Sequence, residues 1–132
     1  MQSLGARAAP RLALQSGPAW NGYIGLRLSV HGRVPPGATG WLALLERVPA
    51  GSEGSVVARE LVRTVAGPLA LQGPREQGAV NHLSALRVPD SARAERLHAR
   101  GWIESAEGAI VAVADDRCTV ARPRRAGPAA PR

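Results

Sequence analysis

Apolar and polar side chains alternate between Tyr23 and Val30, and this stretch carries the clearest structural signal in the chain. Branched apolar residues fill every second position: Ile24, Leu26, Leu28 and Val30. Successive side chains of a strand point to opposite faces, so the alternation predicts a strand with one buried and one exposed face. The Val34-Pro35-Pro36-Gly37 segment is expected to end it, because proline donates no backbone hydrogen bond.

Shorter apolar runs, separated by glycine and proline, predict further strands. Residues 41–45 have the composition of a buried strand, and Trp41 is expected in the core. The longest of the other segments covers residues 79–88, and its expected buried side chains are Val80, Leu83, Leu86 and Val88. The remaining predicted strands cover residues 55–58, 69–71, 102–103 and 109–114.

Two segments predict short helices. Val57, Leu61 and Val65 recur at every fourth position before the stop signal Gly67-Pro68, which favours a helix over residues 58–66, fed by the strand 55–58. After Asp90 or Ser91, the residue types of the run SARAERLHAR also favour a helix. The whole pattern predicts a mainly β domain, a barrel or sandwich with one or two short helices.

Length and composition indicate one domain. The chain has 132 residues, and we expect a flexible lead at 1–19, a folded domain at 20–117 and a disordered arginine- and proline-rich tail at 118–132. Because there is no Phe and only 3% of the residues are aromatic, Leu, Val and Ala have to build the core. Such a core lacks the large burial of aromatic rings, which predicts marginal stability or self-association.

The charge and the cysteine content bear on the possible partners and the cellular location of the chain. The 17 basic residues are all arginine and the net charge is +7, but a GC-rich coding sequence supplies arginine without selection for nucleic acid. Cys118 is the single cysteine, which excludes an intramolecular disulfide and a cysteine-based metal site. The lone thiol and the lack of an apolar run of about 18–20 residues predict an intracellular protein, cytoplasmic or nuclear, without a membrane span.

The order of these segments resembles the dUTPase family over about residues 20–114. NGYIGLRLSVHGRVPPG (21–37) is similar to the family's Gly-Tyr/Phe-Asp-Leu start and the proline-glycine turn after it. VPAGSEG (48–54) is similar to its Pro-x-Gly-x-x-Gly turn, and RGWIESAEGAIV (100–111) to its Arg-Gly turn and Gly-Asp-x-Ile-Ala-Gln strand. The resemblance implies a dUTPase-like β fold, which commonly forms a trimer.

The same resemblance implies that the catalytic motifs are lost. Ile24 stands where the family has the Asp that helps to hold Mg²⁺. Arg59 matches its phosphate-facing arginine, but Glu60 follows where the family has Ser and would repel phosphate. The Tyr beneath the sugar and the Phe-bearing arm are missing, and Glu76 is interpreted as a solvated turn residue rather than a base. Hydrolysis of a triphosphate needs a cation and a base, so we predict no catalytic residue and no cofactor.

A dUTPase-like scaffold without these motifs is similar to the adenovirus early-region accessory proteins, which bind host proteins. The resemblance therefore implies a non-catalytic interaction or regulatory factor, of viral type, whose partners are host or cellular proteins. Trp20 and Trp102 border glycines and are the candidate interface anchors, with the core as the competing location.

Two alternatives remain open. The first is a divergent dUTP diphosphatase that uses Arg59 against phosphate. The second is a small nucleic-acid-binding protein whose tail binds phosphates through Arg122, Arg124 and Arg125. No aromatic residue interleaves with these arginines, so base stacking is not expected in the tail.

The other polar residues predict no metal site. His31, His82 and His98 lie on different segments without the spacing of metal ligands, and are interpreted as surface or core residues. Asp115-Asp116 ends an apolar run and is interpreted as a solvated pair rather than a cation site.

Overall fold

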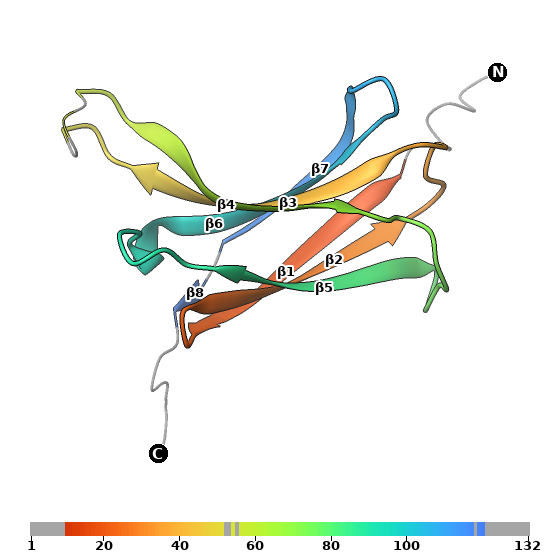
Figure 1. Cartoon of the computed structure of the whole chain (residues 1–132), viewed down its shortest axis with the longest axis horizontal. Coiled ribbons are helices and arrows are strands. Elements are labelled where there is room, and N and C mark those ends of the chain that lie inside the picture. Colours follow the sequence, from red (N-terminus) through yellow and green to blue (C-terminus); the bar gives the residue numbers. More distant parts are fainter. Residues whose placement is uncertain (1–9, 52–53, 55, 118, 121–132) are drawn as a thin grey trace, which may run out of the picture.

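The chain folds as an open sandwich of two four-stranded sheets (Figure 1). The computed structural model describes residues 10–51, 54, 56–117 and 119–120. The β1 sheet has the strand order β5-β2-β1-β8, and the β3 sheet has the order β4-β3-β6-β7. The strands are β1 (Arg11–Trp20), β2 (Tyr23–His31), β3 (Thr39–Val48), β4 (Arg59–Leu69), β5 (Ala79–Arg87), β6 (Leu97–Glu104), β7 (Ile110–Arg117) and β8 (Thr119–Val120).

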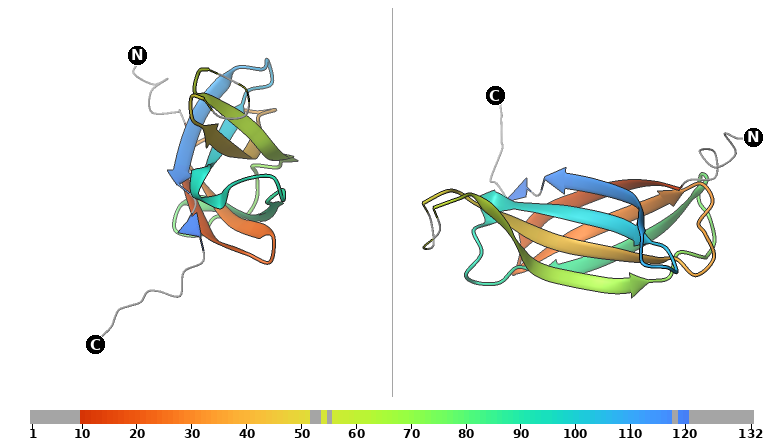
Figure 2. Two further views of the ribbon diagram at one scale, coloured as in Figure 1. Left: turned by 90° about the vertical axis from the view of Figure 1, so that its left-hand side faces the viewer. Right: turned by 90° about the horizontal axis from the view of Figure 1, so that it is seen from above.

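The predicted alternation of β2 is confirmed. Its four apolar side chains at even positions are at most 2% exposed, whereas Tyr23, Gly25 and Arg27 face outward. β2 pairs antiparallel with β1 on one side and with β5 on the other. The inner face of the β1 sheet therefore packs against the β3 sheet, whose strands cross over it in the view from above (Figure 2).

Polar bonds hold the two sheets together along both sides of the sandwich. On one side, Asp116 of β7 accepts hydrogen bonds from the backbone N–H of Ser16 in β1 (2.6 Å) and from its hydroxyl (3.0 Å). On the other side, the Thr64 hydroxyl of β4 donates to the backbone carbonyl of Arg87 in β5 (2.7 Å). Within the β3 sheet, the fully buried Glu46 accepts a hydrogen bond from Nε of Arg63 (2.8 Å), which links β3 to β4.

The helix expected over residues 58–66 is wrong, because this segment belongs to β4. Val62, Thr64 and Val65 are β-branched and favour extended backbone, and pairing with β3 satisfies their main-chain groups. The register of the β3–β4 pairing shifts between Leu44 and Leu45, so the four-residue spacing of Leu61 and Val65 does not mark one face. The strand expected just before it is also wrong for residues 56–58, which are irregular, while Ser55 lies outside the described residues.

The helix expected after Asp90 or Ser91 is reduced to one 3₁₀ turn, η1 (Ala94–Arg96). From Leu97 onward the chain is β6, with its buried residues at every second position: Leu97, Ala99, Gly101 and Ile103. Helix propensities differ by only a few tenths of a kcal/mol among these residue types, so burial of the alternating face decides the structure.

The boundary expected at residue 20 is also wrong. Arg11–Trp20 form β1 between β2 and β8, with Leu12 and Leu14 in or against the core. Gly17-Pro18 does not close a lead but lies at an irregularity in the β1–β2 pairing, where the missing N–H of proline is tolerated. The rest of the expected lead, residues 1–9, and the tail from residue 121 lie outside the described residues.

The mainly β class is confirmed, in the form of an open sandwich. The predicted strands at 41–45, 79–88, 102–103 and 109–114 correspond to β3, β5, β6 and β7, whereas Leu69 only ends β4 and residues 70–71 are not in a strand. Leu83 was expected in the core but is 75% exposed, because it lies on the outer face of β5. The dUTPase-like fold stays a prediction.

Candidate functional site

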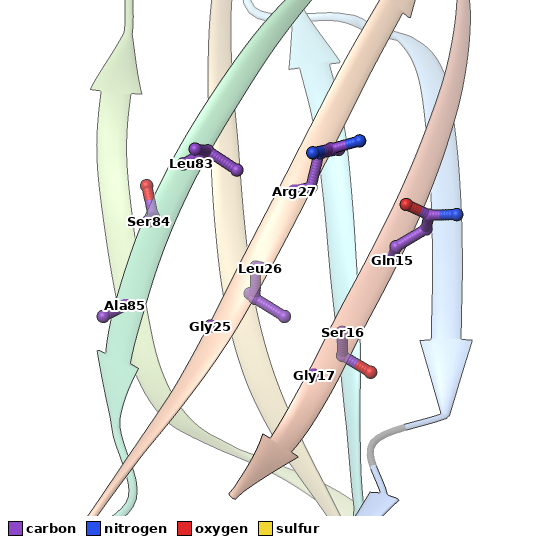
Figure 3. A pocket seen from close by; sticks show the side chains of 9 residues that line it. All are labelled: Gln15, Ser16, Gly17, Gly25, Leu26, Arg27, Leu83, Ser84 and Ala85. Carbon is purple, nitrogen blue, oxygen red and sulfur yellow. The ribbon is translucent and has the colours of Figure 1, made fainter. Parts of the chain in front are cut away.

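An open trough of about 620 Å³ lies on the outer face of the β1 sheet (Figure 3). It extends across β1, β2 and β5, and its lining includes Gln15, Gly17, Gly25, Arg27 and Leu83. Gly17 and Gly25 expose bare backbone, and a Cβ atom added at Gly25 would meet no other atom within 4 Å. The trough therefore exists because two neighbouring strands carry glycine at this point.

Two aromatic side chains stand beside the trough. Trp20 of β1 pairs directly with Tyr23 of β2, and their side chains are 75% and 45% exposed. Tyr23 is two residues from Gly25 on the same face of β2, so both rings lie at one end of the glycine floor. An exposed Trp–Tyr pair beside a shallow floor provides flat surfaces on which a planar ring can stack.

The charge on this face is positive. Arg11, Arg27 and Arg87 are exposed on its strands, and no carboxylate stands among them on β1, β2 or β5. Within the described residues, no hydrogen bond or ion pair engages the side chains of these three arginines. Arg27 also lines a second hollow of about 630 Å³, which continues the trough towards Ser29 and His31 and is lined as well by Glu76 from the turn before β5. The face thus offers guanidinium groups along the direction of β2.

The chain leaves the sandwich beside the aromatic pair. β8 runs parallel to β1, and Val120 is the register partner of Ala19, the residue before Trp20. Arg122, Arg124 and Arg125 follow in the sequence and lie outside the described residues. No aromatic residue lies near this arginine run in the sequence, but the parallel β1–β8 pairing places Val120 beside Ala19, the residue before Trp20.

The outer face of the β3 sheet has a different character. Glu60 of β4 contacts Nε2 of His98 (3.2 Å) and Arg100 (3.8 Å) on β6, and Arg47 on β3 (3.3 Å). Arg100 also donates to Asp115 of β7 (2.7 Å). The hydrogen bond from Arg100 holds the pKa of Asp115 below its ordinary value, and the same bond raises the pKa of Arg100. These cations are therefore engaged by carboxylates of their own face.

The two tryptophans of the β3 sheet stack on each other. Trp41 was expected in the core, but it lies half-buried on the outer face, with its ring centroid 6.5 Å from that of Trp102 and an interplanar angle of 17°. The two residues are register partners on β3 and β6, which explains the stacking. Gly67 lies against the Trp41 ring, since a Cβ atom at Gly67 would come within 2.6 Å of it.

The structure separates the residues singled out in the sequence. Trp20 and Trp102 lie on opposite outer faces of the sandwich, so they cannot anchor one common interface. Arg59 begins β4, whereas Glu76 lies in the turn before β5, beyond the other end of β4. The arginine and the carboxylate that a dUTP diphosphatase would need are therefore not brought together.

The histidines and acidic residues also lie apart. His31, His82 and His98 lie on β2, β5 and β6, and no group of His, Cys, Asp or Glu in the described part of the chain could hold a metal ion. Asp115 and Asp116 point to opposite faces of β7, where one binds Arg100 and the other Ser16. The expected solvated pair is thus two separately bonded carboxylates.

The trough and the exposed arginines of this face were not predicted from the sequence. The signal was present in the alternation of β2, since the strand that buries Leu26 and Leu28 necessarily exposes Gly25 and Arg27. The position of Trp20 could not be found in this way, because β1 had been assigned to the lead.

Comparison with known proteins identifies no relative. No protein-family model, curated protein or solved structure matches the chain. The residues described here contain no helix that is long and apolar enough to cross a membrane.

Proposed function

We propose that this chain is a non-catalytic binding protein that holds single-stranded nucleic acid on the outer face of its β1 sheet. The observation that carries the proposal is the juxtaposition of the exposed Trp20–Tyr23 pair, the glycine floor and the unengaged arginines on one face. Single-stranded nucleic acids need flat rings for their bases and cations for their phosphates, and this face offers both.

The arrangement fits a strand lying along β2. Residues on one face of a strand repeat at about 6–7 Å, the scale at which an extended single strand repeats its nucleotides. A base stacked on Trp20 or Tyr23 would leave the adjoining phosphates above Gly25, within reach of Arg27 and Arg87. The absence of a side chain at Gly25 allows the sugar-phosphate backbone to approach the sheet closely.

Binding of nucleic acid by the tail arginines alone would not select single strands. Arginines alone bind phosphates but provide no ring for a base, so they do not distinguish single-stranded from double-stranded nucleic acid. The β1 sheet supplies the rings, and Val120 at the end of β8 pairs with Ala19, the residue before Trp20. We therefore assign the tail arginines a supporting role, and the aromatic pair the selection of single strands.

The test is a titration of fluorescently labelled oligothymidine and oligouridine, about 15 nucleotides long, with the full chain at low salt. Trp20→Ala is expected to weaken binding by about tenfold to a hundredfold, since base stacking contributes about 1–3 kcal/mol. Trp20→Tyr should retain most of the affinity, because it keeps a ring at the same position. Trp102→Phe on the opposite face is the matched control and should leave the affinity unchanged.

Replacing Arg122, Arg124 and Arg125 by Gln in the full chain separates the two modes of binding. The proposal predicts that this variant binds more weakly but keeps its dependence on Trp20 and its preference for single strands over a duplex. Binding that the triple replacement abolishes and Trp20→Ala leaves intact would assign the activity to the tail alone. Equal affinity of the wild-type chain for both oligomers indicates recognition of shared features, whereas a preference for oligouridine points to contacts with the 2′-hydroxyl.

A protein-interaction function, as the dUTPase-like resemblance implies, is the second candidate. It is favoured by the exposed branched side chains on the outer face of the β3 sheet: Val62, Val65, Ile110 and Val113. A partner that fits this face would present an apolar surface around the Trp41–Trp102 stack. Val65→Glu combined with Val113→Glu should then abolish co-purification of a cellular partner and leave oligonucleotide binding intact; a partner retained by this double variant would exclude the face.

A further inference from the structure

The free edge of β5 presents unpaired backbone groups. β5 pairs with β2 along its full length without an irregularity, and Val88 donates to Gly22 at the end of this ladder (2.8 Å). In an antiparallel ladder the groups of alternate residues point the same way, so those of odd-numbered residues of β5 point away from β2. Asn81, Leu83 and Ala85 use neither their N–H nor their carbonyl in a backbone hydrogen bond among the described residues.

Two neighbouring contacts confirm this direction. Ala79 exchanges both of its backbone hydrogen bonds with Glu76, which occupies the edge at the start of β5 (2.8 and 3.0 Å). At the other end, the carbonyl of Arg87 accepts the Thr64 hydroxyl, while its N–H has no such partner. The open edge therefore extends from Asn81 to Arg87.

This edge lacks the usual protection against strand pairing. Edge strands are generally blunted by proline, charged side chains, a bulge or a short length, and of these features Ala79–Arg87 has only the charged Arg87 at its end. Leu83 stands in the middle of the edge and is 75% exposed. A second strand would shield this side chain and satisfy the open backbone groups.

We propose that β5 pairs antiparallel with β5 of a second copy of this chain, which joins the two β1 sheets into one continuous sheet. Two copies of this open edge, related by a twofold axis, can pair with each other. With Leu83 opposite Ala85 of the second copy, Asn81 falls opposite Arg87, so every residue with an open group finds a partner. This register ends before Ala79, where Glu76 already occupies the edge. It also places no two like charges opposite each other.

The dimer would extend the outer face described above. Leu83, Ser84 and Ala85 line the trough, so the troughs of the two copies would meet at the twofold axis. Two adjoining basic faces bind a longer strand than one does, and linked sites raise the overall affinity. The self-association itself does not rest on nucleic-acid binding and is measured in its absence.

The test is sedimentation velocity of the full chain over a concentration series, without nucleic acid. Ala85→Pro removes an N–H that points away from β2, so it is expected to weaken dimerisation by about tenfold or more while leaving the internal ladder intact. Ala85→Thr keeps this N–H and is the matched control, which should dimerise as the wild-type chain does. Leu83→Glu gives a second variant on an exposed position, and the carboxylates brought together near the axis should also favour the monomer.

Circular dichroism decides whether each variant is folded. A wild-type dimer that both Ala85→Pro and Leu83→Glu dissociate, while Ala85→Thr does not, supports the β5 interface. If Ala85→Pro fails to fold, Leu83→Glu alone decides between the outcomes. A wild-type chain that stays monomeric at the highest attainable concentration overturns the proposal. An oligomer, such as the trimer implied by the dUTPase-like resemblance, that persists unchanged in folded Leu83→Glu overturns it as well.

Discussion

The two outer faces of the sandwich carry similar residue types in opposite arrangements. On the β3 sheet, Arg100 contacts Asp115 and Glu60, and Trp102 stacks on Trp41. On the β1 sheet, no hydrogen bond or ion pair engages the Arg27 side chain within the described residues, although Glu76 lines the same hollow, and Trp20 is largely exposed. A group that is already engaged costs free energy to redirect towards a ligand, whereas an unengaged one is available. Under the proposed function, the β1 sheet would be the binding face, and the engaged charges of the β3 sheet would contribute to stability.

The glycines of the two sheets also differ in their surroundings. In the β3 sheet, Gly101 is required by packing, because a Cβ atom there would lie 2.9 Å from Leu28 and 3.2 Å from Leu42. In the β1 sheet, the space above Gly25 is open. One glycine thus permits close contact between the sheets, and the other leaves room for a ligand.

The largest effect is expected from Gly67→Ala in the β3 sheet. Gly67 has a φ of +145°, and an added Cβ atom would lie 2.6 Å from Cε3 of Trp41 and 3.0 Å from the carbonyl oxygen of Gly40. Backbone strain and overpacking together should lower the free energy of unfolding by roughly 2–5 kcal/mol. Urea denaturation followed by tryptophan fluorescence measures this change.

Gly25→Ala in the β1 sheet is the control for Gly67→Ala in the β3 sheet. It creates no contact within 4 Å, so the free energy of unfolding should change by no more than about 0.5 kcal/mol. Equal destabilisation by the two substitutions would remove the distinction between a packing glycine and a trough glycine.

Gly25→Val is expected to reduce binding without loss of stability. Valine suits an exposed strand position, and its side chain would fill the trough between Gln15 and Leu83. Affinity for oligothymidine should fall by about tenfold, equivalent to roughly 1.4 kcal/mol, while the unfolding midpoint stays at or above that of the wild-type chain. An unchanged affinity with the trough filled would move the binding site away from the β1 sheet.

A smaller effect, also on affinity, is expected from Arg27→Gln. Each phosphate contact on a single strand contributes about 0.7 to the slope of log K against log salt, so removing one contact should reduce this slope by about that amount. Arg100→Gln, on the opposite face, should leave the slope unaltered. Titrations at several salt concentrations measure both, and a slope that responds equally to the two substitutions contradicts a localised site.

The contrast between the faces explains how far the sequence could predict this molecule. The alternation of apolar and polar residues in β2 predicted both its buried and its exposed residues, because successive side chains of a strand point to opposite faces. Most of β4 and the first residues of β6 were predicted as helix, because local propensity could not anticipate their pairing with β3. Strand pairing is a long-range property that depends on which edge is available in the folded chain.

The candidate site depended on the same long-range information. Arg27 and Gly25 could be placed on one face from the alternation alone. The proximity of Trp20 to Tyr23 required β1 to be recognised as a strand, and the position of Val120 beside Ala19 required the parallel pairing of β8. The stacking of Trp41 on Trp102 could not be predicted either, since it depends on the register between β3 and β6.

The smallest effect is expected from Asp115→Asn, which removes one of the paired charges of the β3 sheet and is measured as a change in the free energy of unfolding. The hydrogen bond from Arg100 lowers the pKa of Asp115 from its ordinary value of 3.8, so the carboxylate stabilises the folded chain above that pH. This contribution is lost as the pH falls through the lowered pKa. The Asp115 side chain is 51% exposed, and solvent limits the contribution to about 0.2–1 kcal/mol. Asp115→Asn should therefore unfold more easily than the wild-type chain at pH 7 and low salt, and the two free energies of unfolding should converge below the ordinary carboxyl pKa and at high salt. A difference that persists in strong acid would mean that Asp115 acts through packing, and that the charges of this face are no more engaged than those of the β1 sheet.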